Sequence, residues 1–138
     1  MHIIRKKYRV EMAHQLASAC TGACHETIHG HSYVVELLLT GPLNDDNMVR
    51  DFGSLQYFKD WLMEYFDHAL IMPSTLDLDY LTMLGHFNKK MRLVNVNPTA
   101  EWMAEFIFKE AGAILRDSVK VAEVIVHETE TGYASYKE

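Results

Sequence analysis

The first third of the chain alternates apolar and polar residues in the manner of β-strands. Between residues 3 and 14, charged residues occupy one side of such a strand, and the other side carries Ile4, Tyr8, Val10, Met12 and His14. Between residues 29 and 40, alternate positions hold His29, His31, Tyr33, Val35, Leu37 and Leu39. The polar stretch GPLNDDN predicts a turn after this run, and MVRDF predicts a short strand. We therefore expect two paired strands joined by a loop over residues 17–28.

The middle of the chain changes to helical spacing. Over residues 54–66, apolar residues recur at three- and four-residue steps, as one face of a helix requires. Asn97 and Pro98 predict the start of a second helix, with Asn97 as its N-cap and Pro98 at the first helical position. Its core face would consist of Trp102, Met103, Phe106, Ile107, Ala111, Ile114 and Leu115.

Shorter elements are expected between and after these helices. Residues 74–90 predict a short helix capped by Ser74 or Thr75, and KMRLVNV predicts a short strand. Residues 119–128 predict a strand with one face made of Ala122, Val124, Val126 and Glu128, and YASY predicts the last strand. The main elements in the order ββααββ predict a single α+β domain over residues 1–138. It would have an antiparallel four-stranded sheet with both helices on one face.

Composition narrows the class of protein. The 138 residues carry a formal charge of −6, which argues against nucleic acid as a partner. Hydrophobic residues make up 49% and charged residues 23%, as in globular proteins, and no apolar run is long enough for a membrane span. The basic N-terminal stretch lacks the apolar segment of a signal peptide, so we expect a cytoplasmic protein. In that compartment Cys20 and Cys24 would be thiols, metal ligands or a nucleophile or base.

Three histidines form the main candidate for a site. His29 and His31 point the same way from one strand, and the glycine between them suits a close approach of backbones. Antiparallel pairing of the first two strands would bring His14 to them. Three imidazoles fit a zinc site with an open fourth position, which is typical of catalysis. Two alternatives remain: ordinary surface histidines, and a closed structural site of Cys20, Cys24 and two of the histidines.

Motifs along nearly the whole chain resemble one family. AHQL, IHGHSY, the DH pair after the first helix, NPTAE and HETETGYASY occur in this order over residues 3–136. Together they resemble the 6-pyruvoyl-tetrahydropterin synthase family, which includes the 6-carboxy-tetrahydropterin synthases of queuosine biosynthesis. FDHALI and VHETETGYASY are most similar to the second group.

The resemblance implies an architecture and an activity. The fold would be the tunnelling fold, in which subunits join their sheets into a barrel, here a homohexamer or another homo-oligomer with active sites at subunit interfaces. Zinc would bind His14, His29 and His31, and the substrate would be 7,8-dihydroneopterin triphosphate. The remaining roles implied are a proton relay of Asp67 and His68, and substrate binding by Glu128 and Thr99.

The catalytic base is where this chain departs from the family pattern. The carboxy-tetrahydropterin synthases place a cysteine four residues before the HGH motif, but that position is His25, and Cys24 is one residue earlier. Glu26 matches the E-x2-HGH spacing of relatives that cleave the dihydroneopterin side chain. We therefore expect a 6-carboxy-5,6,7,8-tetrahydropterin synthase with Cys24 as base. The alternatives are a 6-pyruvoyl-tetrahydropterin synthase or side-chain-cleaving relative that uses Glu26, and a non-catalytic zinc-binding module. Residues 72–96 are longer than in compact members of the family.

Overall fold

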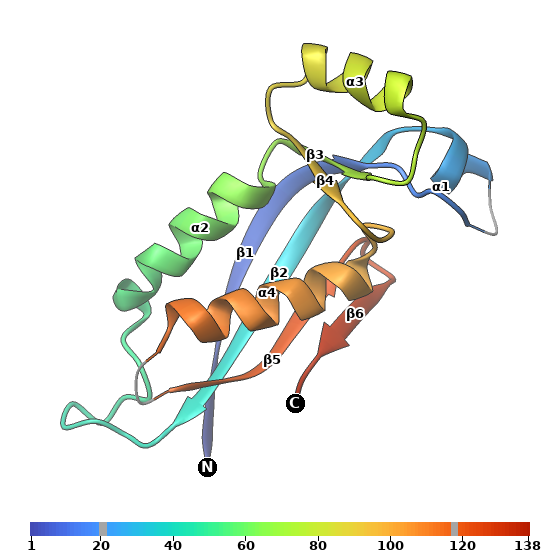
Figure 1. Cartoon of the computed structure of the whole chain (residues 1–138). Coiled ribbons are helices and arrows are strands. Elements are labelled where there is room, and N and C mark those ends of the chain that lie inside the picture. Colours follow the sequence, from blue (N-terminus) through green and yellow to red (C-terminus); the bar gives the residue numbers. More distant parts are fainter. Residues whose placement is uncertain (20–21, 117–118) are drawn as a thin grey trace.

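The computed structural model describes residues 1–19, 22–116 and 119–138 (Figure 1). Its helices and strands follow in the order β1 (His2–His14), α1 (Gly22–Glu26), β2 (His29–Gly41), the 3-10 helix η1 (Phe52–Leu55), α2 (Gln56–Phe66), β3 (Ala69–Pro73), α3 (Leu78–Phe87), β4 (Met91–Val94), α4 (Ala100–Ile114), β5 (Lys120–His127) and β6 (Tyr133–Tyr136).

The predicted pairing of the first two strands is confirmed. β1 and β2 run antiparallel over their whole length, from the pair His2 and Gly41 to the pair His14 and His29. The apolar sides of both strands are buried in the core, as the alternation requires. This register places the end of β1 directly beside the start of β2.

The predicted α+β order ββααββ is confirmed for β1, β2, α2, α4, β5 and β6, but β3 and β4 bring the sheet to six strands, and it is mixed where four antiparallel strands were predicted. The strand order is β4-β3-β1-β2-β5-β6, and β3 runs parallel to both β1 and β4. Residues 69–73 gave no strand signal because all five are buried, so they show no alternation of apolar and polar positions. β4 corresponds to the short strand predicted from KMRLVNV.

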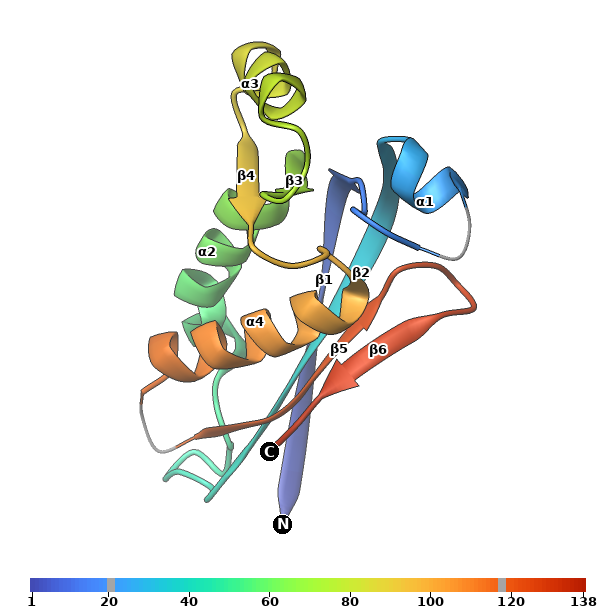
Figure 2. The ribbon, with the colours of Figure 1, turned by 45° about the vertical axis from the view of Figure 1, so that its right-hand side comes forward.

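Two helices cover one face of the sheet, as predicted. α2 and α4 lie side by side on this face in both views (Figures 1 and 2). Their buried side chains meet the apolar side of the two long strands. The fully buried members of this core include Val10, Tyr33, Val35, Leu37, Phe58, Leu62, Phe66, Met103, Ile107 and Val124.

Two helix starts differ from the predictions. α4 is capped by Thr99, whose hydroxyl accepts the Trp102 N–H, whereas the Asn97 side chain is bonded to the backbone of Ala17 and Ser18. Asn97 is therefore not the cap. α3 is capped by Asp77, not by Ser74 or Thr75, because the chain first turns at the end of β3.

Three other local predictions are corrected. The segment between β1 and β2 contains the short helix α1, so it is not entirely a loop. MVRDF forms no strand, since Asp51 instead caps η1 by accepting the Gly53 N–H. In β5 the register against β2 shifts between Leu38 and Leu39, which places Val121 rather than Ala122 against the core.

A second, smaller apolar cluster lies at the end of the sheet where β1 ends and β2 begins. Leu70 and Met72 of β3 and Leu81 of α3 form its buried part, and Ile28 packs against them. α3 stands above this end of the sheet, away from α2 and α4 (Figures 1 and 2). In the part of the chain that the structure describes, no helix is long and apolar enough to cross a membrane.

Candidate metal centre

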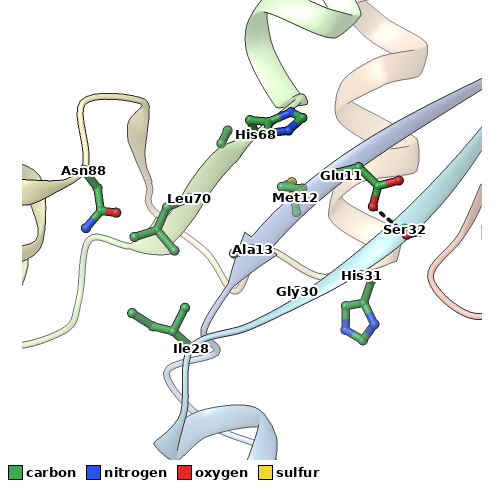
Figure 3. Close-up of a pocket in the computed structure, with 11 residues that line it drawn as sticks. Glu11, Met12, Ala13, Ile28, Gly30, His31, Ser32, His68, Leu70 and Asn88 are labelled. Carbon is green, nitrogen blue, oxygen red and sulfur yellow. Dashed lines mark hydrogen bonds between the residues drawn. The ribbon is translucent and has the colours of Figure 1, made fainter.

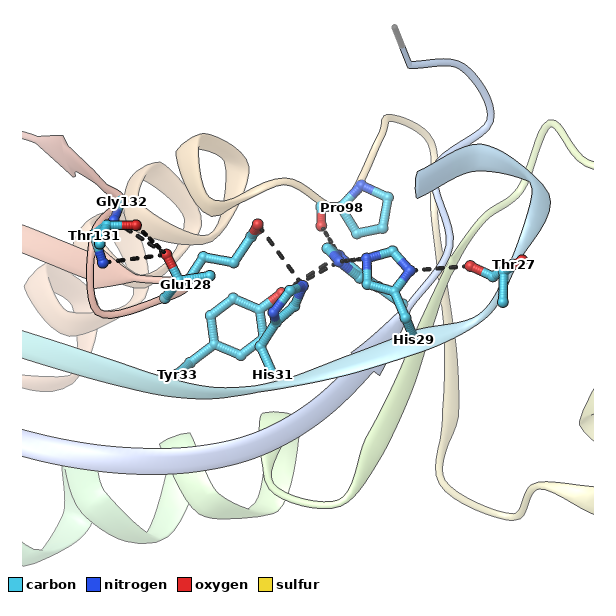
Figure 4. A network of polar contacts seen from close by, with 10 residues as sticks. Thr27, His29, His31, Tyr33, Pro98, Glu128, Thr131 and Gly132 are labelled. Carbon is cyan, nitrogen blue, oxygen red and sulfur yellow. Dashed lines mark hydrogen bonds and ion pairs between the residues drawn. The ribbon is translucent and has the colours of Figure 1, made fainter. Parts of the chain in front are cut away.

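Three imidazoles converge where β1 ends and β2 begins. One ring nitrogen from each of His14, His29 and His31 lies within 4.8 Å of the others. The Nε2 atoms of His14 and His29 are 3.0 Å apart. Figure 4 shows the rings of His29 and His31 on the same side of β2. The register between β1 and β2 produces this arrangement, because His14 is the partner of His29 and lies two residues beyond Met12, the partner of His31.

Backbone carbonyls set the orientation of two of these rings. His14 Nδ1 lies 2.7 Å from the Pro98 carbonyl oxygen, and His29 Nδ1 lies 3.0 Å from that of Thr27. A carbonyl oxygen only accepts hydrogen bonds, so each Nδ1 carries the proton and donates it. In the neutral rings, both Nε2 atoms then present lone pairs at 3.0 Å from each other. Such a pair is repulsive unless a cation lies between them, which is the arrangement that metal-binding histidines have.

The third ring fits the same interpretation. His31 Nε2 is buried and has no hydrogen-bond partner among the described residues, and an orphaned buried nitrogen needs an explanation such as an ion. Burial is the main reason that the pKa of His14 lies below its usual value, and it keeps that imidazole in the neutral form that binds metals. The three side chains therefore suit a divalent metal of the zinc type with room for further ligands.

Glu128 lies beside the histidines. Its Oε1 is 3.7 Å from His31 Nε2, and Figure 4 shows the carboxylate reaching toward that ring from the end of β5. The Glu128 N–H donates to the Gly132 carbonyl, which holds the turn between β5 and β6. Thr99 is on the neighbouring helix end, where its hydroxyl already caps α4. The structure thus brings Glu128 to the histidines and shows Thr99 as the cap of α4.

Gly30 permits the close approach of the two strands. A Cβ at this position would lie 3.3 Å from the Met12 carbonyl oxygen. Since that oxygen belongs to the backbone of β1, it has little freedom to move away. The expected close approach of backbones at the glycine between His29 and His31 is confirmed.

Asp67 and His68 are in contact with each other. Asp67 Oδ2 lies 2.8 Å from His68 Nδ1, and Oδ1 accepts the Glu11 N–H at 2.9 Å. Burial would raise the pKa of the Asp67 carboxyl, but the bonds from Glu11 and His68 outweigh it and hold the pKa below the usual value. His68 has a φ of 58°, a strained conformation for a residue with a Cβ. Asp67 thus orients an imidazole that the fold holds at some energetic cost.

His68 is not part of the histidine cluster. Its side chain is 78% exposed, and in Figure 3 its ring and that of His31 do not point toward one another. Both residues line a cavity of about 500 Å³ at the mouth of β1, β2 and β3 (Figure 3). Within one chain, the Asp67–His68 pair and the three clustered histidines are therefore separate groups.

The two candidate bases lie on α1. The Glu26 side chain is 73% exposed, and its Oε1 is 3.6 Å from His25 Nε2. Cys24 is partly buried, and in the described part of the chain it does not belong to the group of converging ligand atoms. Cys20, the other cysteine of the closed four-ligand alternative, lies outside the described residues.

Sequence reasoning missed the groups that support the site. The carbonyls of Thr27 and Pro98 have no signal in a sequence because every residue has a carbonyl. Gln15 is buried and bonded to α1, although alternation from the inward-facing His14 would place it on the opposite side. His127 was expected at the surface or an interface. Its Nε2 lies 2.9 Å from Oε1 of the buried Glu36, on the other side of the sheet from the three histidines.

Comparisons with known proteins agree with this geometry. The family model described as 6-pyruvoyl tetrahydropterin synthase matches residues 3–138. The chain belongs to this family. A protein of Helicobacter pylori strain 26695 named 6-carboxy-5,6,7,8-tetrahydropterin synthase is 31% identical over 141 residues, which cover 96% of this chain and 70% of that protein. The protein of that name from Aquifex aeolicus is 36% identical over 124 residues, with 80% and 74% covered.

Solved structures show the same fold. An uncharacterized protein from Wolinella succinogenes superposes with a TM-score of 0.86 at 22% identity, covering 99% of this chain and 98% of that one. Plasmodium falciparum 6-pyruvoyl tetrahydropterin synthase gives a TM-score of 0.73 at 19% identity, with 99% and 97% covered. A Plasmodium vivax enzyme of the same name, solved with its catalytic glutamate replaced by alanine, gives 0.70 at 19% identity, with 100% and 99% covered. The expected tunnelling fold is confirmed, with six strands in the sheet.

Proposed function

We propose that this protein is a 6-carboxy-5,6,7,8-tetrahydropterin synthase that acts on 7,8-dihydroneopterin triphosphate. The observation that carries the proposal is the convergence of three histidine nitrogens beside a carboxylate, in a chain that covers most of two relatives with this name. The family as a whole acts on pterins, and an enzyme on such a substrate needs a metal or base at the side chain and an anchor for the ring.

His14, His29 and His31 would hold a zinc ion. The nitrogen ligands and the two carbonyl-oriented rings support zinc, and three protein ligands leave a position open for substrate. When bound, the ion would act as a Lewis acid that lowers the pKa of side-chain hydroxyl groups of the substrate.

Glu128 would anchor the pterin. As a carboxylate it can accept two hydrogen bonds, one from the ring N3–H and one from the 2-amino group. Its position 3.7 Å from His31 would bring the substrate side chain toward the three histidines. Thr99, at the nearby start of α4, would contribute a further contact through its hydroxyl hydrogen while the oxygen caps the helix.

The proton-transfer base would come from α1. Cys24 is the residue type that the carboxy-tetrahydropterin synthases use, and its thiol could act as a thiolate near a metal. Glu26 is the specific competitor, because a structural relative from Plasmodium vivax uses a catalytic glutamate. A glutamate base would favour a 6-pyruvoyl-tetrahydropterin synthase or a side-chain-cleaving enzyme.

Asp67 and His68 would act as a proton relay in a site shared between two copies of the chain. The carboxylate holds the Nδ1 proton of His68, which leaves Nε2 to exchange protons with a substrate. The high exposure of His68, and its separation from the clustered histidines, support its use by a neighbouring subunit. We accordingly propose a homo-oligomer, a hexamer in the arrangement of the family.

The test is to identify the product. Purified protein loaded with zinc is incubated with 7,8-dihydroneopterin triphosphate. The pterin products are then separated by chromatography and identified by their masses in mass spectrometry. A 6-carboxy product that disappears in Cys24→Ala and persists in Glu26→Ala supports the proposal. A 6-pyruvoyl or 6-hydroxymethyl product, or loss of activity only in Glu26→Ala, favours the glutamate alternative.

Zinc content separates the enzyme from a non-catalytic zinc-binding module. In the module, Cys20 and Cys24 would be ligands and His14 would be dispensable. If the protein is the proposed enzyme instead, His14→Ala should lose zinc, and Cys20→Ala should retain one ion per chain. The opposite pattern, with no pterin product, would establish the module.

A further inference from the structure

A buried amide connects the metal centre to two helices. Gln15 follows His14 directly, and only 7% of its surface is exposed. Its Nε2 donates to the His25 carbonyl of α1 at 2.9 Å, and its Oε1 accepts the Tyr80 hydroxyl of α3 at 2.6 Å. The orientation of the amide is determined, because the carbonyl of His25 can only accept and must face the NH2 group.

α1 depends on these contacts for its position. A helix of five residues is too short to be stable by itself. Two consecutive carbonyls near its end are bonded from outside: Gln15 donates to that of His25, and the Leu16 N–H donates to that of Cys24 at 2.9 Å. Gln15 and Leu16, which follow His14, thus hold the helix on which both candidate bases lie.

α3 completes the support. Tyr80 stands in the first turn of α3, and its N–H donates to the Asp77 side chain, so the same residue joins the cap of this helix to Gln15. Ile28, just after α1, packs on the apolar cluster that contains Leu81 of α3. α3 is therefore linked to the chain on both sides of α1, by the hydrogen bond of Tyr80 to Gln15 before it and by the apolar cluster that Ile28 joins after it.

A different residue holds the start of the chain that connects β1 to β2. Asn97, which does not cap α4, accepts the Ala17 N–H at 2.7 Å and donates to the Ser18 carbonyl at 3.2 Å. Since Asn97 precedes Pro98, whose carbonyl orients His14, this clamp is continuous with the metal centre. The chain between β1 and β2 is therefore held near both of its ends.

We infer that Gln15 and Tyr80 are positioning residues, and that α3 acts as a brace that fixes α1 relative to the three histidines. The catalytic part of this inference rests on the proposed function, which places the base on α1. Residues of α3 do not contact the substrate in this interpretation. They keep the base at one distance from the reacting atoms, and small errors in that distance slow proton transfer strongly.

Tyr80→Phe tests the brace because it removes one hydroxyl and leaves the ring in place. Hydrogen exchange of the amides in residues 22–28 should become about fivefold faster, as expected for the loss of one buried hydrogen bond. The kcat should fall by about tenfold, with KM and zinc content unchanged, because the base is displaced while substrate and metal contacts remain. Tyr57→Phe is the matched control, since Tyr57 on α2 is 82% exposed.

Gln15→Glu is the second variant. It can still accept the Tyr80 hydroxyl, but it places a carboxylate oxygen against the His25 carbonyl, so exchange at α1 should rise at least as much as in Tyr80→Phe. Unchanged exchange in both variants would overturn the brace. Faster exchange with unchanged kcat would overturn the positioning role. If the wild type makes no pterin product, the proposed function fails, and the exchange measurement still decides the brace.

Discussion

Zinc should stabilise the fold strongly, and one histidine should account for most of the effect. The site is preformed in the structure: two rings are already oriented by backbone carbonyls, and the ligand nitrogens lie within 4.8 Å. Zinc at about 1,000 times its Kd adds about 4 kcal/mol to the free energy of unfolding. At about 4 °C per kcal/mol for a domain of this size, Tm should rise by about 16 °C.

His14→Ala should remove most of this gain. Loss of an outer partner of a metal ligand already weakens metal binding by up to about 100-fold, and loss of a ligand should exceed that. At the same zinc concentration, the remaining stabilisation is then below about 1.4 kcal/mol, or about 6 °C in Tm.

Differential scanning calorimetry with and without zinc checks both values. His2→Ala serves as the control, because His2 is exposed at the start of β1, at the other end from His14. Its zinc-dependent rise in Tm should equal that of the wild type. An equal rise in His14→Ala would refute the assignment of the three-histidine centre, as would a wild type whose Tm does not respond to zinc.

Three further substitutions test the local geometry. Gly30→Ala should weaken zinc binding by about tenfold in a chelator competition, since its Cβ meets the Met12 carbonyl, whereas Gly112→Ala, whose Cβ meets nothing, should not. Asp67→Asn should cost about 1–2 kcal/mol in urea unfolding at pH 7. A carboxyl whose pKa is lowered by folding stabilises the fold at pH values above its ordinary pKa of 3.8, and this stabilisation is lost as the pH falls through the pKa of the folded state. The stability difference between Asp67→Asn and the wild type should therefore shrink toward about pH 2. An equal difference at pH 7 and pH 2 contradicts the assignment. Phe58→Ala should cost about 3–5 kcal/mol, because its ring is fully buried on the core face of α2, and a smaller loss would mean that this core is loosely packed.

The elements with a clear local period were predictable. The long strands β1 and β2 alternate, and α2 and α4 repeat at helical spacing, so their type and burial follow from neighbouring residues. β3 has no such pattern because it is buried on both faces, and its parallel partners come from distant parts of the chain. Helix starts were less predictable, since several residues near each start can cap.

The sequence by itself determined the pair of long strands and, through their alternation, the three histidines on one side of them. Only the tertiary structure decided what surrounds these histidines: the carbonyls that orient two rings, the carboxylate of Glu128 beside the third, and the exposed position of His68. It also decided that α3 reaches α1 through Gln15. The physical reason is the same in each case. Alternation along a strand is a property of adjacent residues, whereas these contacts join segments that only the path of the chain brings together.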